Sequence, residues 1–104
     1  GNFTRGSLHG GVISSVLDVV GGLVAFIALL NREGVQSLED EADKFSRLGT
    51  IDLRVDYLRP GLGGTFSAKG FVLRAGRKVA VTRMELHNDE DSLIAVGTGA
   101  YSIS

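Results

Sequence analysis

The chain has 104 residues, of which 43% are hydrophobic and 22% charged, the composition of one small globular domain. Its net charge of -1 leaves no basic surplus to neutralise phosphates, which argues against nucleic acid as the main partner. It contains no cysteine, which excludes disulfide bonds, a thiolate nucleophile and Cys-ligated metal sites and fits a cytoplasmic protein.

Residues 12–30 (VISSVLDVVGGLVAFIALL) form a long apolar run in which Asp18 is the sole charged residue. By length the run could span a membrane; the alternative is a helix buried on all sides in a soluble domain. Burial is favoured, because a carboxylate at mid-span would be costly in lipid. We therefore expect no membrane span but a buried helix that begins near Gly10 or Gly11 and ends near Asn31.

Residues 37–48 predict a second, short helix. Ser37 and Asp40 fit a capping pattern at its start, and Gly49 is placed to end it. Its acidic run is interpreted as a solvated face rather than a functional patch.

From Thr50 onward the hydrophobic period changes to two, which indicates strands. The predicted strands are residues 50–57, 64–74, 77–87 and 93–103. Gly70 predicts a bulge or weak point in the second strand, and small residues in the last strand indicate close packing against a helix. The order predicts an α+β fold, in which a curved antiparallel meander of four strands wraps around one long buried helix.

Two features of the long helix could carry chemistry. His9, Gly10 and Gly11 stand at its start, where peptide N–H groups and the helix dipole favour negative charge and could stabilise a developing oxyanion. The alternative is that these glycines only permit a tight turn. Asp18 is flanked by apolar residues, so its carboxylate must be functional, or else paired with or hydrogen-bonded to a neighbouring strand.

The spacing of these features has a consequence for assembly. Gly10 and Asp18 are separated by about 12 Å of helix axis, so one helix cannot bring both to the same reacting atom. If both act, the helix N-terminus of one subunit must face Asp18 of another across antiparallel helices. This predicts a two-fold dimer with two composite sites. Self-association would also stabilise a chain of this size, which buries only about 60–65% of its unfolded surface.

The remaining candidates are fewer. Arg74, Arg77 and Lys78 surround one hairpin, which is either a solvated edge or a contact for the phosphates of a nucleotide-bearing substrate. His87 ends a strand beside a polar turn and is interpreted as a surface residue. The two histidines are far apart in sequence and give no metal-site spacing, and Ser14 is not part of a nucleophile elbow.

Residues 8–13 (LHGGVI), with Asp18 nine positions after His9, resemble the signature of hotdog-fold acyl-CoA thioesterases of the phenylacetate-degradation (PaaI-like) type. Residues 50–61 (TIDLRVDYLRPG) resemble that family's strand ending in Arg-Pro. The resemblance runs from about residue 6 to 103 and implies a single hotdog domain over residues 1–104, with the strand that precedes the His loop missing or outside this segment.

The resemblance implies hydrolysis of an aryl- or acyl-CoA thioester to a free acid and CoA, with no metal and no cofactor besides the coenzyme A of the substrate. In such enzymes the backbone N–H matching Gly10 polarises the thioester carbonyl, the residue matching His9 orients the carbonyl or the turn, and Gly11 would contact the substrate. Asp18 would act as general base or nucleophile, and Thr50 would assist the attacking water. Such enzymes assemble as homodimers or homotetramers.

Two other functions remain open. A hydratase or dehydratase of the same fold would carry a His-Phe-Pro-Gly or an Asp-x-Asn-x-x-His motif, and neither occurs in the sequence. A non-catalytic acyl-CoA-binding or dimerisation module is the second alternative, against which the retained Asp18 and the glycine turn both argue.

Overall fold

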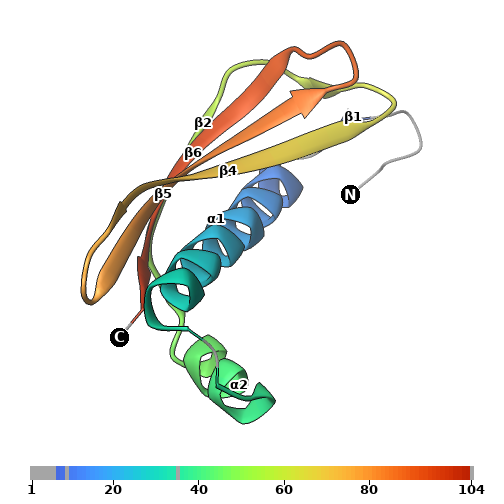
Figure 1. The fold of residues 1–104 in the computed structure, drawn as a ribbon. Helices are drawn as coiled ribbons and strands as arrows, with labels where there is room; N and C mark the ends of the chain where they lie inside the picture. Colours follow the sequence, from blue (N-terminus) through green and yellow to red (C-terminus); the bar gives the residue numbers. More distant parts are fainter. Residues whose placement is uncertain (1–6, 9, 35, 104) are drawn as a thin grey trace.

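The computed structural model of the chain describes residues 7, 8, 10–34 and 36–103, and over these it is an α+β fold. The elements in chain order are β1 (Ser7–Leu8), α1 (Gly10–Glu33), α2 (Leu38–Ser46), β2 (Gly49–Tyr57), β3 (Gly61–Leu62), β4 (Phe66–Ala75), β5 (Val79–Asn88) and β6 (Leu93–Ser102). Figure 1 shows α1 lying along one face of the main sheet and α2 standing beyond its end. The predicted fold class is confirmed.

The main sheet has the strand order β2-β6-β5-β4, and all neighbouring strands are antiparallel. The prediction of a simple four-stranded meander is therefore wrong in one respect, because β2 pairs with β6 and not with β4. Short turns join β4 to β5 and β5 to β6, so these strands pair with their sequence neighbours. The longer segment 58–65 carries the chain from one edge of the sheet to the other, and its β3 pairs with β1.

Helix α1 packs on the sheet through one face only. Its buried side chains include Ile13, Leu17 and Leu29, whereas Leu23 and Ile27 on the opposite face are 48% and 54% exposed. The expectation of a helix buried on every side is thus wrong for a single chain. The fold has two layers, the main sheet and α1, so the sheet covers only the helix face that packs against it. By length and composition alone α1 could cross a membrane, a test that core helices of soluble proteins also pass.

Glycines on two strands let the sheet approach α1 closely. At Gly70 of β4, an added Cβ would lie 2.9 Å from Val20 Cγ1 and closer still to Val24. At Gly97 of β6, it would lie 3.5 Å from Leu17 Cδ1, which confirms the predicted close packing of the last strand on the helix. The bulge predicted at Gly70 is wrong: the pairing register shifts between Val72 and Arg74, and Gly70 pairs regularly with Met84.

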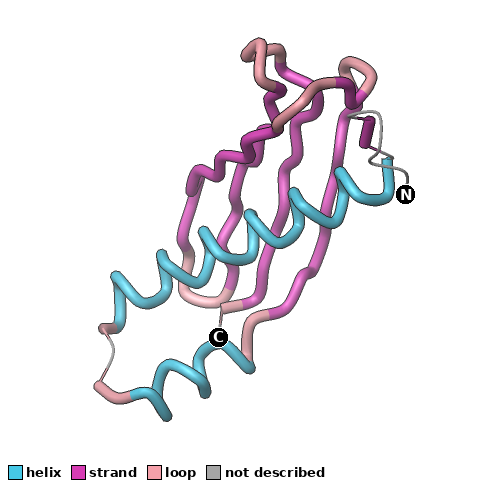
Figure 2. The backbone as a smooth tube through the Cα atoms, turned by 90° about the vertical axis from the view of Figure 1, so that its right-hand side faces the viewer, coloured by secondary structure: helices cyan, strands magenta, loops and turns pink. Residues whose placement is uncertain are grey.

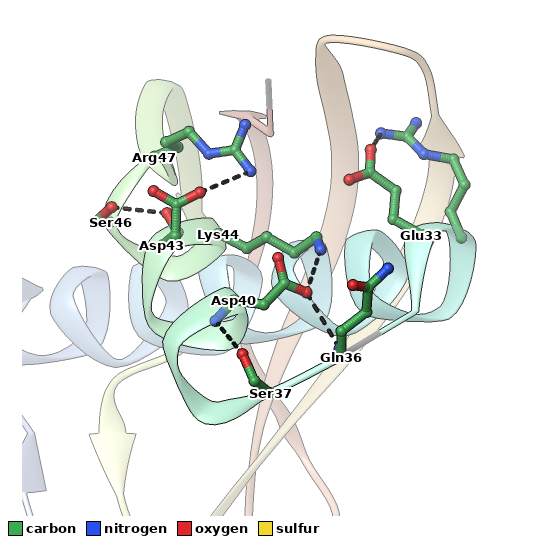
Figure 3. Close-up of polar contacts among 9 residues, drawn as sticks. Glu33, Gln36, Ser37, Asp40, Asp43, Lys44, Ser46 and Arg47 are labelled. Carbon is green, nitrogen blue, oxygen red and sulfur yellow. Dashed lines mark hydrogen bonds and ion pairs between the residues drawn. The ribbon is translucent and has the colours of Figure 1, made fainter.

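Helix α2 begins at a side-chain cap. Ser37 Oγ accepts a hydrogen bond from the Asp40 backbone N–H at 3.0 Å, as the capping pattern predicts. The Asp40 carboxylate accepts from the Gln36 N–H at 3.3 Å and from Lys44 Nζ at 2.7 Å (Figure 3). The Lys44 bond first, and then the Gln36 bond, hold the pKa of Asp40 below its usual value.

The end of α2 differs from the prediction. The helix ends at Ser46 and Arg47 closes it, because the Arg47 N–H already bonds to the last-turn carbonyls. Gly49 does not cap the helix but opens β2, where it pairs with Ser102. Figure 2 shows the chain turning directly from α2 into the sheet. This short connection places the start of β2 against the middle of α1.

Candidate active site

Asp18 lies on α1, on the side that faces the start of β2 and the end of β6, and its side chain is partly buried. Its Oδ1 atom accepts a hydrogen bond from Thr50 Oγ1 at 3.1 Å. It also accepts one from the Tyr101 hydroxyl at 3.0 Å. The structure therefore brings together two of the residues predicted from sequence, Asp18 and Thr50, and adds Tyr101.

Tyr101, near the end of β6, is the residue that the sequence analysis missed. Its side chain is 1% exposed, and its hydroxyl also donates to the Asp18 backbone carbonyl at 3.2 Å. Burial first, and then the bond to Asp18, raise the pKa of the Tyr101 hydroxyl well above its usual value, so that it is a hydrogen-bond donor at neutral pH. The sequence did contain a pattern that could have pointed to Tyr101. Gly97, Gly99 and Tyr101 are two residues apart along β6 and so share one face of the strand, and Gly97 faces α1.

A pocket of about 250 Å³ opens beside the Asp18 carboxylate. It is lined by Asp18, Val19, Gly22, Leu23, Phe45, Leu48, Gly49, Thr50 and Tyr101. The walls are mostly apolar, and the polar side chains among them are the carboxylate and the two hydroxyls bonded to it. Such a pocket can hold an apolar group with its reacting carbon next to one base.

The N-terminal turn of α1 is the second candidate region. Gly10 and Gly11 are both exposed, and an added Cβ at Gly11 would meet nothing within 4 Å. The Tyr57 hydroxyl donates to the Gly10 carbonyl at 2.8 Å and shares a hydrogen bond with Ser14 Oγ. This explains Ser14 as part of the turn's structure. His9, which the resemblance places here, lies outside the described residues.

The two regions are not brought together within one chain. Gly10 and Asp18 lie on one continuous helix, α1, so about 12 Å of helix axis separates them. The structure therefore has the separation on which the predicted composite site rests, and that prediction holds if both groups act.

The basic hairpin joins β4 to β5. Arg74, Arg77 and Lys78 line a shallow pocket of about 310 Å³ at its turn. Arg32, in the last turn of α1, donates hydrogen bonds to the carbonyls of Gly76 and, at 3.4 Å, Arg77. The predicted cations are thus gathered at one place, which lies at the C-terminal end of α1 and away from Asp18 of the same chain.

His87 is more enclosed than the sequence analysis expected. Its side chain is 14% exposed and lies between Glu85, at 3.0 Å from Nε2, and Asp91, at 3.3 Å from Nδ1. The His87 and Arg83 contacts lower the pKa of Glu85. Among the described residues no three His, Asp or Glu side chains gather as a metal site. Asp18 therefore presents a carboxylate beside a mainly apolar pocket.

Comparisons with known proteins show what the chain is similar to. The model of the thioesterase superfamily matches residues 5–95. The medium/long-chain acyl-CoA thioesterase YigI of Escherichia coli is 52% identical over 99% of this chain. The chain spans 66% of the length of that relative.

Two solved structures are also similar. A protein from Shewanella oneidensis related to the thioesterase superfamily is 51% identical, with a TM-score of 0.89 over 100% of this chain and 68% of its own. A protein from Syntrophus aciditrophicus is 46% identical, with a TM-score of 0.86 over the same shares of the two chains.

Proposed function

The chain belongs to the thioesterase superfamily, and we propose that it hydrolyses acyl-CoA thioesters to a free acid and coenzyme A. The observation that carries the proposal is the Asp18 carboxylate, which two hydroxyls hold at the edge of an otherwise apolar pocket. The 52% identity to an enzyme named for medium/long-chain acyl-CoA thioesters supports it. In line with the cysteine-free sequence, we expect the enzyme to act in the cytoplasm, with residues 1–104 contributing one hotdog domain.

We propose that the acyl part of the thioester substrate is a medium or long aliphatic chain rather than an aryl group. Aliphatic and aromatic side chains, Val19, Leu23, Phe45 and Leu48, line the pocket beside Asp18. A flexible acyl chain can follow such an irregular apolar surface and gain free energy from every methylene that it buries. The name of the Escherichia coli relative points to the same class.

The proposed reaction uses Asp18 as general base. The carboxylate takes a proton from water while the water oxygen attacks the thioester carbonyl carbon. The backbone N–H of Gly10, on the partner subunit, hydrogen-bonds to the carbonyl oxygen and stabilises its developing charge. The C–S bond then breaks, and the CoA sulfur leaves and receives the proton from Asp18. Thr50, bonded to Asp18 and exposed at the pocket, can orient the water. No metal or separate cofactor takes part.

The same proposal requires a homodimer, or a homotetramer made of such dimers. The helix stripe of Val19, Leu23 and Ile27 is 61%, 48% and 54% exposed, and it flanks the Asp18 side chain. An antiparallel α1 from a second copy would cover apolar surface there and bring its N-terminus near Asp18.

The phosphates of coenzyme A are assigned to the basic hairpin. Arg74, Arg77 and Lys78 supply three cationic side chains around one shallow pocket, and Arg32 fixes the turn that carries two of them. Charged hydrogen bonds from such groups are the usual way in which proteins hold phosphates.

A thiol-release assay with a panel of acyl-CoA and aryl-CoA thioesters tests the function. We expect release that is fastest with medium or long acyl chains and that Asp18→Asn reduces strongly. Binding of acyl-CoA without thiol release would instead identify a non-catalytic module, and hydration of an enoyl-CoA would identify a hydratase. After a single turnover in H₂¹⁸O, label in the Asp18 side chain would identify Asp18 as the nucleophile, because water that opens an Asp18–acyl anhydride at the side-chain carbon leaves its oxygen there. General-base catalysis places the label in the product acid alone.

Subunit complementation tests the composite site. Asp18→Asn removes the base, and Gly10→Pro removes the backbone N–H. In a mixed dimer of these two variants, one of the two sites keeps both groups. Random mixing should therefore restore about a quarter of the wild-type activity. No recovery, with mixed dimers present on a native gel, would show that each site is built from one chain.

A further inference from the structure

The buried hydroxyl of Tyr101 meets the same carboxylate atom as Thr50. Tyr101 donates to Asp18 Oδ1 at 3.0 Å, and Thr50 donates to it at 3.1 Å. Among residues 7, 8, 10–34 and 36–103, no donor is hydrogen-bonded to the second carboxylate oxygen, Oδ2. Within the described residues, the carboxylate is thus held through Oδ1 alone.

Two glycines make room for this tyrosine. At Gly21, one turn after Asp18 on α1, an added Cβ would clash with the Tyr101 hydroxyl oxygen. At Gly99 on β6, it would lie 2.6 Å from Cε2 of the ring and 2.8 Å from the hydroxyl oxygen. A helix and a strand therefore both lack side chains where the ring and hydroxyl of Tyr101 lie. The close fit fixes the direction in which the hydroxyl points.

We propose that Tyr101 is a positioning residue for the hydrolysis assigned to Asp18. Together with Thr50 it holds Oδ1, so that Oδ2 is the oxygen that receives the proton of the attacking water. A carboxylate fixed in this way does not have to give up side-chain rotation when the substrate binds. The inference rests on the proposed function, since it assigns a role within that reaction.

The first test is Tyr101→Phe, which removes the hydroxyl and keeps the ring. We expect kcat to fall about tenfold or more, with KM for acyl-CoA within about twofold of wild type. Thr82→Val is the matched control, because Thr82 is fully buried in the same sheet and its hydroxyl bonds to Met84 rather than to Asp18. The control should keep its kcat. A wild-type kcat in folded Tyr101→Phe would overturn the proposal.

A double-mutant cycle with Asp18→Asn separates positioning from general loss of structure. If Tyr101 acts through the carboxylate, Tyr101→Phe should not lower the residual kcat of the Asp18→Asn enzyme any further. An equal fold-loss in both backgrounds would mean a structural role only. Should Tyr101→Phe fail to fold, p-aminophenylalanine at this position keeps a donor of similar size and should retain activity, whereas inactivity in that folded variant would contradict the proposal.

The two proposals can fail separately. A wild-type enzyme that hydrolyses no thioester overturns the proposed function and this inference with it. An active wild type with an unaffected, folded Tyr101→Phe variant overturns the role of Tyr101 alone.

Discussion

The two ends of the proposed chemistry lie on one helix and are built in opposite ways. Around Asp18, β2 and β6 supply hydroxyls from Thr50 and Tyr101, and the carboxylate is partly buried beside a pocket. At the N-terminus of α1, Gly10 and Gly11 are exposed. The Asp18 carboxylate is therefore held by hydroxyls of its own chain, whereas the glycine turn is exposed.

This contrast bears on how the enzyme would be assembled. A base must keep one orientation, which buried hydrogen bonds provide. An amide that polarises a substrate carbonyl must remain open to that substrate, and small residues keep it open. A chain that holds its carboxylate firmly and exposes its helix N-terminus is suited to a dimer in which each subunit offers that N-terminus to the other subunit's carboxylate.

The largest effect on kcat is expected from replacing the Asp18 carboxylate. Asp18→Asn keeps an oxygen that can accept from Thr50 and Tyr101, so the fold should remain intact, with an unchanged circular dichroism spectrum. Loss of the base should lower kcat by about 10²- to 10⁴-fold in the thiol-release assay. Full turnover in this variant would exclude Asp18 as the base.

Breaking the other end comes next. Gly10→Pro removes one backbone N–H at a position where proline suits the start of a helix, and kcat should fall about 10²- to 10³-fold. Gly10→Ala is its control, since the N–H stays and the added Cβ would lie 3.6 Å from the Tyr57 ring, an ordinary contact. Equal losses in the two variants would point to the turn's shape rather than to its N–H.

A smaller effect is expected from removing charges at the basic hairpin. This region is proposed to bind substrate without taking part in the chemistry, unlike the Asp18 region and the N-terminus of α1. Arg77→Ala with Lys78→Ala should raise KM for an acyl-CoA about threefold to tenfold and leave kcat unchanged. With an N-acetylcysteamine thioester, which carries no phosphate, KM should not change. A similar rise for both substrates would argue against phosphate binding.

The smallest effect concerns stability at alkaline pH. The pKa of Tyr101 is raised in the folded protein, so its contribution is fully present below the unfolded value near 10 and is lost as the pH rises through the folded pKa. Between about pH 9 and pH 11, wild type should lose about 1 kcal/mol more unfolding free energy than Tyr101→Phe. Urea denaturation at both pH values measures this difference. If the unfolding free energies of the two proteins fall equally between these pH values, the folded protein does not hold the Tyr101 proton more tightly than the unfolded chain does.

Local features of this protein were predictable from the sequence because local forces produce them. The apolar run gave α1 to within a few residues, and Ser37 caps α2 as its pattern indicated. The prediction was less complete for features that depend on which elements of the chain pack against each other. The pairing of β2 with β6, the exposed face of α1 and the outline of the hairpin pocket all depend on which elements lie side by side.

The candidate site shows the same division. The sequence by itself determined a lone acid in an apolar helix and glycines at that helix's start, because composition and spacing along one chain segment define them. Only the tertiary structure decided that Thr50 and Tyr101, 32 and 83 residues away from Asp18, meet on a single carboxylate oxygen. Periodicity acts over a few residues, whereas the choice of a distant hydrogen-bond partner depends on how strands order and how closely a helix can pack on them.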